Sequence, residues 1–135
     1  MAERSEGRGC KTLLIVEDQT LLREVLLDFL RNRFPGCRFL EAADGAGAFR
    51  AVCDCRPALI LMDKCLPDAD GIELTARLTK LFPETEVIVM SSWSGDAYAQ
   101  HALAAGARLF LSKDSLTAEL IPAVEEAFGI SAAFN

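Results

Sequence analysis

Short apolar runs alternate with longer amphipathic segments along the whole chain. The runs have the length and the continuous apolar character of strands that are buried on both faces of a parallel sheet. The longer segments place apolar residues three and four positions apart, which predicts helices with one buried face. The predicted strands span residues 12–16, 38–42, 58–62, 86–90 and 108–112. The predicted helices span residues 19–34, 46–55, 72–82, 95–105 and 116–128.

Proline and glycine mark most of the predicted helix ends. Pro35 and Gly36 follow the first helix, Pro83 follows the third, and Gly106 follows the fourth. Pro122 lies inside the last predicted helix, where a proline costs about 3 kcal/mol. The pattern therefore leaves open whether this helix is kinked or starts late.

The strict alternation of strands and helices, without an internal repeat, is typical of an α/β domain. Right-handed crossovers between successive strands give a parallel sheet that is covered by helices on both sides. Five strands of this length predict a flavodoxin-like (βα)5 doubly wound parallel sheet with strand order 2-1-3-4-5. In such a sheet, ligands bind at the carboxyl edge, at the switch point between strands 1 and 3.

Residues with useful chemistry stand where four of the predicted strands end. Glu17 and Asp18 follow the first strand, Asp63 the third, Ser91 the fourth and Lys113 the fifth. Three carboxylates at one edge need compensation, and Mg²⁺ is the simplest hard cation that prefers oxygen ligands. Three carboxylates, one magnesium ion and the Lys113 ammonium sum to zero formal charge. Such a site accepts a phosphoryl group, and the Ser91 hydroxyl is able to donate to it.

Each of these residues also has an ordinary structural explanation. Glu17 and Asp18 suit the start of the following helix, because acids stabilise a helix N-terminus. Ser91 suits a loop or a cap, Asp63 the start of a turn, and Lys113 a solvated surface. Their coincidence at four strand ends favours one shared site over separate explanations.

Composition narrows the class of protein. The chain has 135 residues, of which 51% are hydrophobic and 25% charged, which is typical of one globular domain. The net charge of −6 disfavours direct binding of nucleic acid by this chain. No run approaches the roughly 20 apolar residues of a membrane span, and no signal peptide is recognisable. Five cysteines without a CxxC pair disfavour a disulfide framework. We therefore expect a cytoplasmic protein without a membrane partner.

From about Lys11 to Phe128 the chain resembles the receiver domain of bacterial two-component response regulators. The resemblance rests on the acidic pair Glu17-Asp18, on Asp63 within Asp-x-x-Leu-Pro-x-x-Asp-Gly, on Ser91 and on Lys113. The pair Lys113-Asp114 replaces the commoner Lys-Pro of the family. It resembles the LuxR/NarL-type subfamily, whose receivers precede a helix-turn-helix DNA-binding domain.

The resemblance implies a role for each residue of the site. It implies that Asp63 is the phosphoacceptor and that Lys113 and Ser91 act with it in catalysis. It also implies a magnesium site that is formed by Glu17, Asp18, Asp63 and the main-chain carbonyl of Cys65. The chain would then catalyse only its own phosphorylation and dephosphorylation, and would not otherwise be an enzyme.

The resemblance also implies a switch and a set of partners. Ser91 and Phe110 occupy the positions of the family's two switch residues. The implied partners are a sensor histidine kinase and a second copy of the chain in a homodimer. DNA would be bound only through an output domain that is absent from this chain.

The domain boundaries follow from the same resemblance. We expect a flexible leader over residues 1–10, the receiver domain over 11–129, and a C-terminal tail or the start of a linker over 130–135. Whether the receiver is excised or stands alone is open. The isomer of the Lys113-Asp114 bond is also open, because a cis bond before a non-proline residue costs about 3–4 kcal/mol.

Three other functions compete with this interpretation. A haloacid-dehalogenase-like phosphatase would have a second aspartate two residues after Asp63, where this chain has Cys65. Gly45-Ala46-Gly47 resembles a dinucleotide-binding fingerprint, but Arg50 stands where the third glycine would be, and the run follows the second strand. The main alternative is a degenerate receiver that serves as a phosphorylation-independent dimerisation module. A residue suited to the phosphoryl-transfer chemistry stands at each of the five site positions, which argues against a degenerate receiver.

Overall fold

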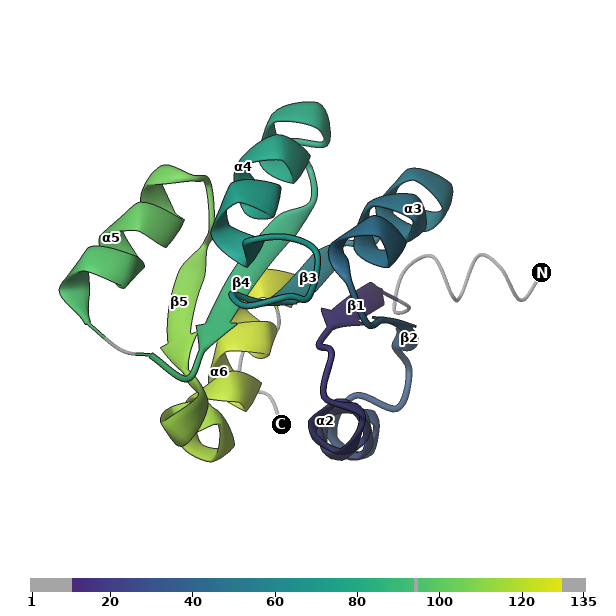
Figure 1. The fold of residues 1–135 in the computed structure, drawn as a ribbon. Helices are drawn as coiled ribbons and strands as arrows, with labels where there is room; N and C mark the ends of the chain where they lie inside the picture. The colour runs from purple at the N-terminus through teal and green to yellow at the C-terminus, as the bar shows by residue number, and fades with distance from the viewer. Residues whose placement is uncertain (1–10, 94, 130–135) are drawn as a thin grey trace.

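Five strands lie side by side in a parallel sheet in the order β2-β1-β3-β4-β5 (Figure 1), which confirms the predicted topology. The computed structural model describes residues 11–93 and 95–129. The leader predicted for residues 1–10 and the tail predicted for 130–135 lie outside the described residues. The strands are β1 (Thr12–Val16), β2 (Arg38–Ala42), β3 (Leu59–Asp63), β4 (Glu86–Ser91) and β5 (Leu109–Ser112).

Helices cover both faces of the sheet, with α2 and α6 on one side and α3, α4 and α5 on the other (Figure 1). This arrangement is the predicted flavodoxin-like fold. A short 3-10 turn, η1 (Lys113–Ser115), joins β5 to the last helix. The helices are α2 (Thr20–Arg33), α3 (Gly45–Cys55), α4 (Gly71–Leu81), α5 (Asp96–Ala104) and α6 (Leu116–Phe128).

Alternate side chains of the inner strands enter two separate cores. Leu13 and Ile15 of β1 pack in the core beneath α2 and α6, whereas Leu14 and Val16 pack in the core beneath α3, α4 and α5. All five residues of β3 are buried. Because both faces of the inner strands are covered, these strands have no polar face, which explains the continuous apolar runs.

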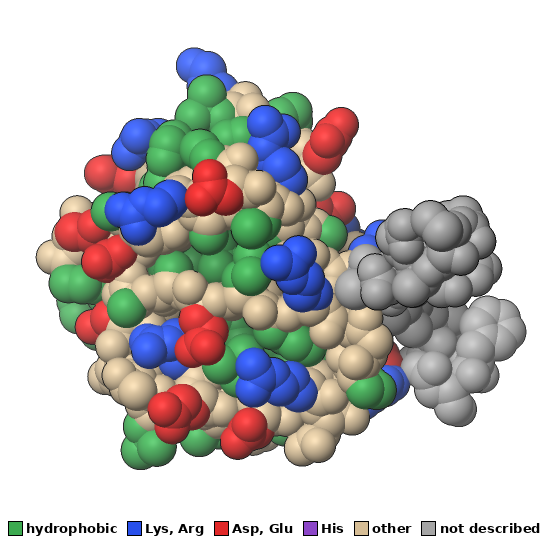
Figure 2. Space-filling view, turned by 90° about the vertical axis from the view of Figure 1, so that its right-hand side faces the viewer, with side chains coloured by type: hydrophobic (Ala, Val, Ile, Leu, Met, Phe, Trp, Pro, Cys, Tyr) green, Lys and Arg blue, Asp and Glu red, His purple; other side chains and the backbone are tan. Residues whose placement is uncertain are grey.

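The edge strand β2 is more exposed than the inner strands and carries charge. Its Glu41 accepts a hydrogen bond of 3.0 Å from Arg23 of α2, and Arg38 at its start is exposed. Charges on an edge disfavour pairing with a further strand. On the side of the molecule that carries α3 and β2, both basic and acidic side chains surround a central apolar area (Figure 2).

Side-chain caps and one close contact hold the ends of the helices next to the sheet. Asp44 accepts from the Gly47 N–H at 2.7 Å and caps α3, while Asp70 accepts from the Ile72 N–H at 2.8 Å and caps α4. A Cβ atom on Gly71 would lie 2.1 Å from the main-chain oxygen of Asp63. Only glycine therefore allows α4 to begin so close to the end of β3.

The structure settles two points that the sequence leaves open, the start of the last helix and the isomer of the Lys113-Asp114 bond. The last helix begins at Leu116 and continues through Pro122, so it does not start late. The described residues contain no cis peptide bond, and the Lys113-Asp114 bond is therefore trans. Within the described ranges, no helix has both the length and the apolar character needed to cross a bilayer.

Candidate functional site

Three carboxylates meet where β1 and β3 end. Glu17, Asp18 and Asp63 each place an oxygen within 4.8 Å of the others. The two strands are neighbours in the sheet, with Val16 paired to Met62, so their carboxyl ends lie side by side. Glu17 is fully buried and Asp63 is only 4% exposed, whereas Asp18 is exposed. The cluster therefore has a buried floor and one open side.

Lys113 reaches this cluster from the far end of the sheet. Its Nζ donates to Glu17 Oε1 at 2.9 Å and lies 3.2 Å from Asp63 Oδ1. Because β4 separates β5 from β3, the side chain crosses the end of β4 to make these contacts. The structure thus brings together the carboxylates that follow β1 and β3 and the ammonium group that follows β5, as the positions in the sequence predict.

Hydrogen bonds fix both the main chain and the side chain of Glu17. Its N–H donates to the Ala42 carbonyl at 3.0 Å, and its own carbonyl accepts from Arg23 Nη1 at 2.6 Å. Glu17 Oε2 accepts from the Gln19 N–H at 3.1 Å. Arg23 was not predicted as part of the site, because nothing in the spacing marks a helix residue that turns back to the preceding carbonyl.

Ser91 lies at the end of β4, between the acid cluster and the next helix. It is 1% exposed, and its Oγ accepts a hydrogen bond of 2.9 Å from the Trp93 N–H. Among the described residues, no hydrogen bond joins Ser91 to Asp63. Phe110 on β5 is half-buried and packs against the core beneath α3, α4 and α5. Its strand partner is Val89, two residues before Ser91.

A family model described as the response regulator receiver domain matches residues 13–125. The chain belongs to the receiver domain family. YhcZ of Bacillus subtilis, an uncharacterized transcriptional regulatory protein, is 33% identical over 109 residues, which cover 81% of this chain and 51% of YhcZ. The transcriptional activator protein ExaE of Pseudomonas putida is 35% identical over 112 residues, which cover 83% of this chain and 52% of ExaE.

Solved structures give the same result for the fold. A LuxR-family response regulator from Aurantimonas sp. SI85-9A1 superposes with a TM-score of 0.82 and 30% identity, covering 90% of this chain and 87% of that one. The CheY of Borrelia burgdorferi, solved in complex with CheX, shares the fold at a TM-score of 0.81 and 22% identity, over 91% of this chain and 98% of that one. The predicted resemblance to LuxR-type receivers is therefore confirmed. The chain spans about half the length of the curated relatives it matches.

Burial sets the electrostatics of the receiver site. Burial raises the pKa of Glu17 above its ordinary value of 4.5, although the hydrogen bond from Lys113 opposes the shift. Burial would lower the pKa of Lys113, but the hydrogen bond to Glu17 and the charge of Asp63 outweigh it, and the net shift is upward. Lys113 is therefore held as an ammonium, while the ionised form of Glu17 is disfavoured.

The oxygen donors of the cluster fit Mg²⁺. All three side chains offer carboxylate oxygens, which are the hard ligands that this ion prefers, and exposed Asp18 gives access from solvent. With the Lys113 charge included, three ionised carboxylates leave a formal charge of −2, which a divalent cation neutralises. The main chain of Cys65 lies in the adjoining loop, where it pairs with Asp70.

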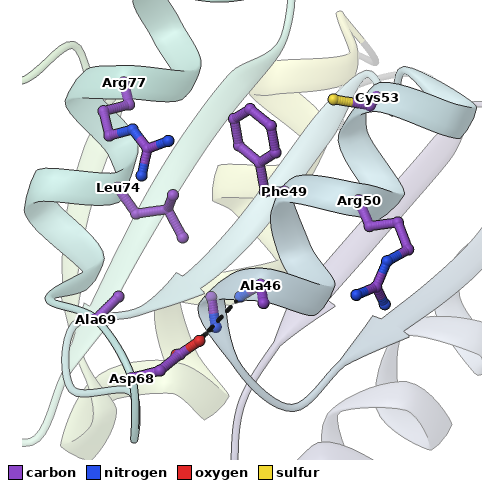
Figure 3. A pocket seen from close by; sticks show the side chains of 9 residues that line it. Ala46, Phe49, Arg50, Cys53, Asp68, Ala69, Leu74 and Arg77 are labelled. Atoms are coloured by element: carbon purple, nitrogen blue, oxygen red, sulfur yellow. Dashed lines mark hydrogen bonds between the residues drawn. The ribbon is translucent and has the colours of Figure 1, made fainter.

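The loop that follows Asp63 is tied to α3 through Asp68, a contact that was not predicted. The Asp68 carboxylate accepts from the Gly45 N–H at 2.7 Å and the Ala46 N–H at 3.0 Å (Figure 3). These two hydrogen bonds lower the pKa of Asp68 below 3.8. A hollow of about 590 Å³ opens beside this contact, between α3 and α4, and is bordered by Arg50 and Arg77 (Figure 3). It contains none of the predicted site residues.

Replacing Glu17 by glutamine tests the cost of its buried charge. Because the pKa of Glu17 is raised in the folded protein, its contribution to stability is complete below about pH 4.5 and is lost as the pH rises through the folded pKa. Glutamine keeps the size and an acceptor oxygen but does not ionise. In metal-free buffer, we expect Glu17→Gln to be more stable than the wild type at about pH 8, with a difference that shrinks toward pH 4.5.

Urea unfolding at several pH values measures this difference. Glu73→Gln provides a charge-matched control, because Glu73 is exposed on α4. A Glu17→Gln protein that is less stable than the wild type at the higher pH would show that the Lys113 contact outweighs the burial cost.

Proposed function

We propose that this chain accepts a phosphoryl group on Asp63 from a sensor histidine kinase. The observation that carries the proposal is the Lys113 ammonium, 3.2 Å from Asp63 Oδ1 at the edge of a cluster of three carboxylates. A carboxylate that only capped a helix would not need a half-buried ammonium group from a distant strand. Membership of the receiver family supports the same assignment.

The chemistry is an in-line transfer between two nucleophiles. An oxygen of Asp63 forms a bond to phosphorus as the P–N bond of the kinase phosphohistidine breaks, and the imidazole keeps the bonding electron pair. The Lys113 ammonium stabilises charge on a phosphoryl oxygen, and the Ser91 O–H donates to another. Positioning and charge stabilisation by these groups, rather than general acid or base catalysis, account for the reaction.

A bound magnesium ion would be held by Glu17, Asp18, Asp63 and the Cys65 carbonyl. When bound, it would supply positive charge that neutralises the phosphoryl oxygens and lets the anionic donor approach an acidic site. Asp18 is the exposed member of the set and therefore the ligand that solvent reaches first. The Lys113 ammonium contacts both buried carboxylates and offsets the repulsion between them.

Phosphorylation would then alter a surface at the α5 side of the sheet. Ser91 turns from the Trp93 N–H toward the phosphoryl group, and Phe110 moves inward to fill the space behind it. Among the residues of α5 only Ala102 is buried, so this helix is weakly anchored and easily displaced. The altered surface would control homodimerisation or a transcriptional output domain that binds DNA.

The remaining assignments follow from this function. The chain would act in the cytoplasm, where a kinase and an output domain are accessible. It would catalyse only its own phosphorylation and dephosphorylation. Residues 11–129 would form the receiver domain, with a leader before it and a tail or linker after it.

Asp63→Asn should abolish phosphorylation, because an amide oxygen is a far poorer nucleophile than a carboxylate. Intact-protein mass spectrometry after treatment with acetyl phosphate and Mg²⁺ measures the adduct. Asp54→Asn is the matched control, since Asp54 is exposed on α3 and outside the site, and this variant should keep the adduct. A stoichiometric adduct on Asp63→Asn would show that another residue accepts the phosphoryl group, and no adduct on the wild type would favour the phosphorylation-independent dimerisation module.

Ser91→Ala should uncouple the surface change from phosphorylation. The variant keeps Asp63 and Lys113, so it should still take up the phosphoryl mimic beryllofluoride. It lacks the hydroxyl that is proposed to turn toward the phosphoryl group. Amide exchange and sedimentation with and without beryllofluoride compare it with the wild type and with Ser92→Ala, an exposed neighbour. Changes confined to the Asp63 loop in the wild type, or equal changes in α5 of Ser91→Ala, would contradict the switch.

A further inference from the structure

Lys64, the residue after Asp63, has a buried side chain that the proposed chemistry does not use. Its Nζ lies 4.9 Å from the centre of the Tyr98 ring, 5.7 Å from the centre of the Trp93 ring and 3.3 Å from Asp70 Oδ2. Both ring distances are within the range in which a cation is attracted by an aromatic face. We call Lys64, Trp93, Tyr98 and Asp70 the Lys64 cage.

The cage joins segments on both sides of β4. Asp70 is the cap of α4, Trp93 lies just after β4, and Tyr98 is in the first turn of α5. The two rings also contact each other, with centroids 6.0 Å apart. Lys64 itself cannot shift easily, because its N–H donates to the Met90 carbonyl at 2.8 Å and its carbonyl accepts from the Gly71 N–H at 2.6 Å.

The cage is linked to Ser91 through Trp93. The Trp93 N–H donates to Ser91 Oγ at 2.9 Å, so the place of Trp93 and the direction of the hydroxyl are linked. If Ser91 moves toward Asp63, this hydrogen bond lengthens or Trp93 follows it. The hydrogen bond is kept only if Trp93 moves, and a movement of Trp93 disturbs its ring contacts with Lys64 and Tyr98.

We propose that Lys64 is a positioning residue that stabilises the unphosphorylated arrangement of Ser91, Trp93 and the first turn of α5. The inference rests on the proposed function of Asp63. Contacts made only in one of two conformations lower the affinity of any ligand that needs the other. Lys64 therefore weakens the response of the receiver to a phosphoryl group and sets the threshold at which α5 moves.

A purely structural role makes the opposite prediction. If the Lys64–Asp70 pair only supported the start of α4, then removing Lys64 would loosen the loop that carries Asp63, and binding at Asp63 would stay equal or weaken. If the cage restrains Ser91, then removing the Lys64 charge strengthens binding. The direction of the change separates the two roles.

The decisive variant is Lys64→Met, which keeps an unbranched apolar side chain but removes the cation. Lys80→Met, on the exposed surface of α4, makes the same charge change outside the cage. With beryllofluoride and Mg²⁺ as the probe, followed by fluorine NMR, we expect Lys64→Met to bind roughly five- to tenfold more tightly than the wild type, from the loss of two cation–π contacts. Lys80→Met and Lys64→Arg should bind like the wild type.

A second measurement does not depend on loading the site. In metal-free buffer, amides of Trp93 and the first turn of α5 should exchange faster in Lys64→Met than in the wild type or in Lys80→Met. Tyr98→Leu, which removes the nearer ring, should reproduce both effects if Lys64→Met does not fold.

Equal or weaker beryllofluoride binding by Lys64→Met, or unchanged exchange near α5, would overturn the inference. If the wild type itself takes up neither beryllofluoride nor a phosphoryl group, then the proposed function of Asp63 fails. In that case the exchange measurement still decides whether Lys64 restrains this segment.

Discussion

The contact of the Lys113 ammonium with Glu17 and Asp63 is the interaction on which the rest of the site depends. Glu17 is fully buried and Asp63 nearly so, and two ionised carboxylates in such surroundings repel each other strongly unless a cation lies between them. Lys113 supplies that cation from β5 by crossing the end of β4. One positive charge does not balance three carboxylates, so the cluster remains receptive to a further cation and then to a phosphoryl group.

The fold makes this contact possible by aligning the strand ends and by fixing the loop that follows β3. Gly71 allows α4 to approach the main chain of Asp63, Asp70 caps that helix, and Asp68 binds the first N–H groups of α3. The loop that carries the acceptor is thereby held by two helices. The position of the loop is therefore determined by packing and hydrogen bonds of residues that do not touch the carboxylate groups of the acid cluster.

The topology and the main site residues were predictable because both follow from simple patterns. Continuous apolar runs mark the inner strands, and a parallel sheet necessarily brings the residues that follow them to one edge. Lys64 was not predictable in the same way, because a lysine is expected in solvent and its aromatic partners lie far along the chain. The end of β3 was placed one residue early, since the pairing of Asp63 with Met90 uses main-chain groups that side-chain polarity does not report.

We propose that Asp63 accepts a phosphoryl group beside a metal site, with the Lys113 ammonium against a phosphoryl oxygen. The most direct measurement is a crystal structure of the chain soaked with beryllofluoride and Mn²⁺, with the metal located by anomalous scattering. We expect beryllium on an oxygen of Asp63, the metal against Asp18 and Asp63, and the Lys113 ammonium against a fluorine. An adduct on another carboxylate, or a metal outside the cluster, would contradict it.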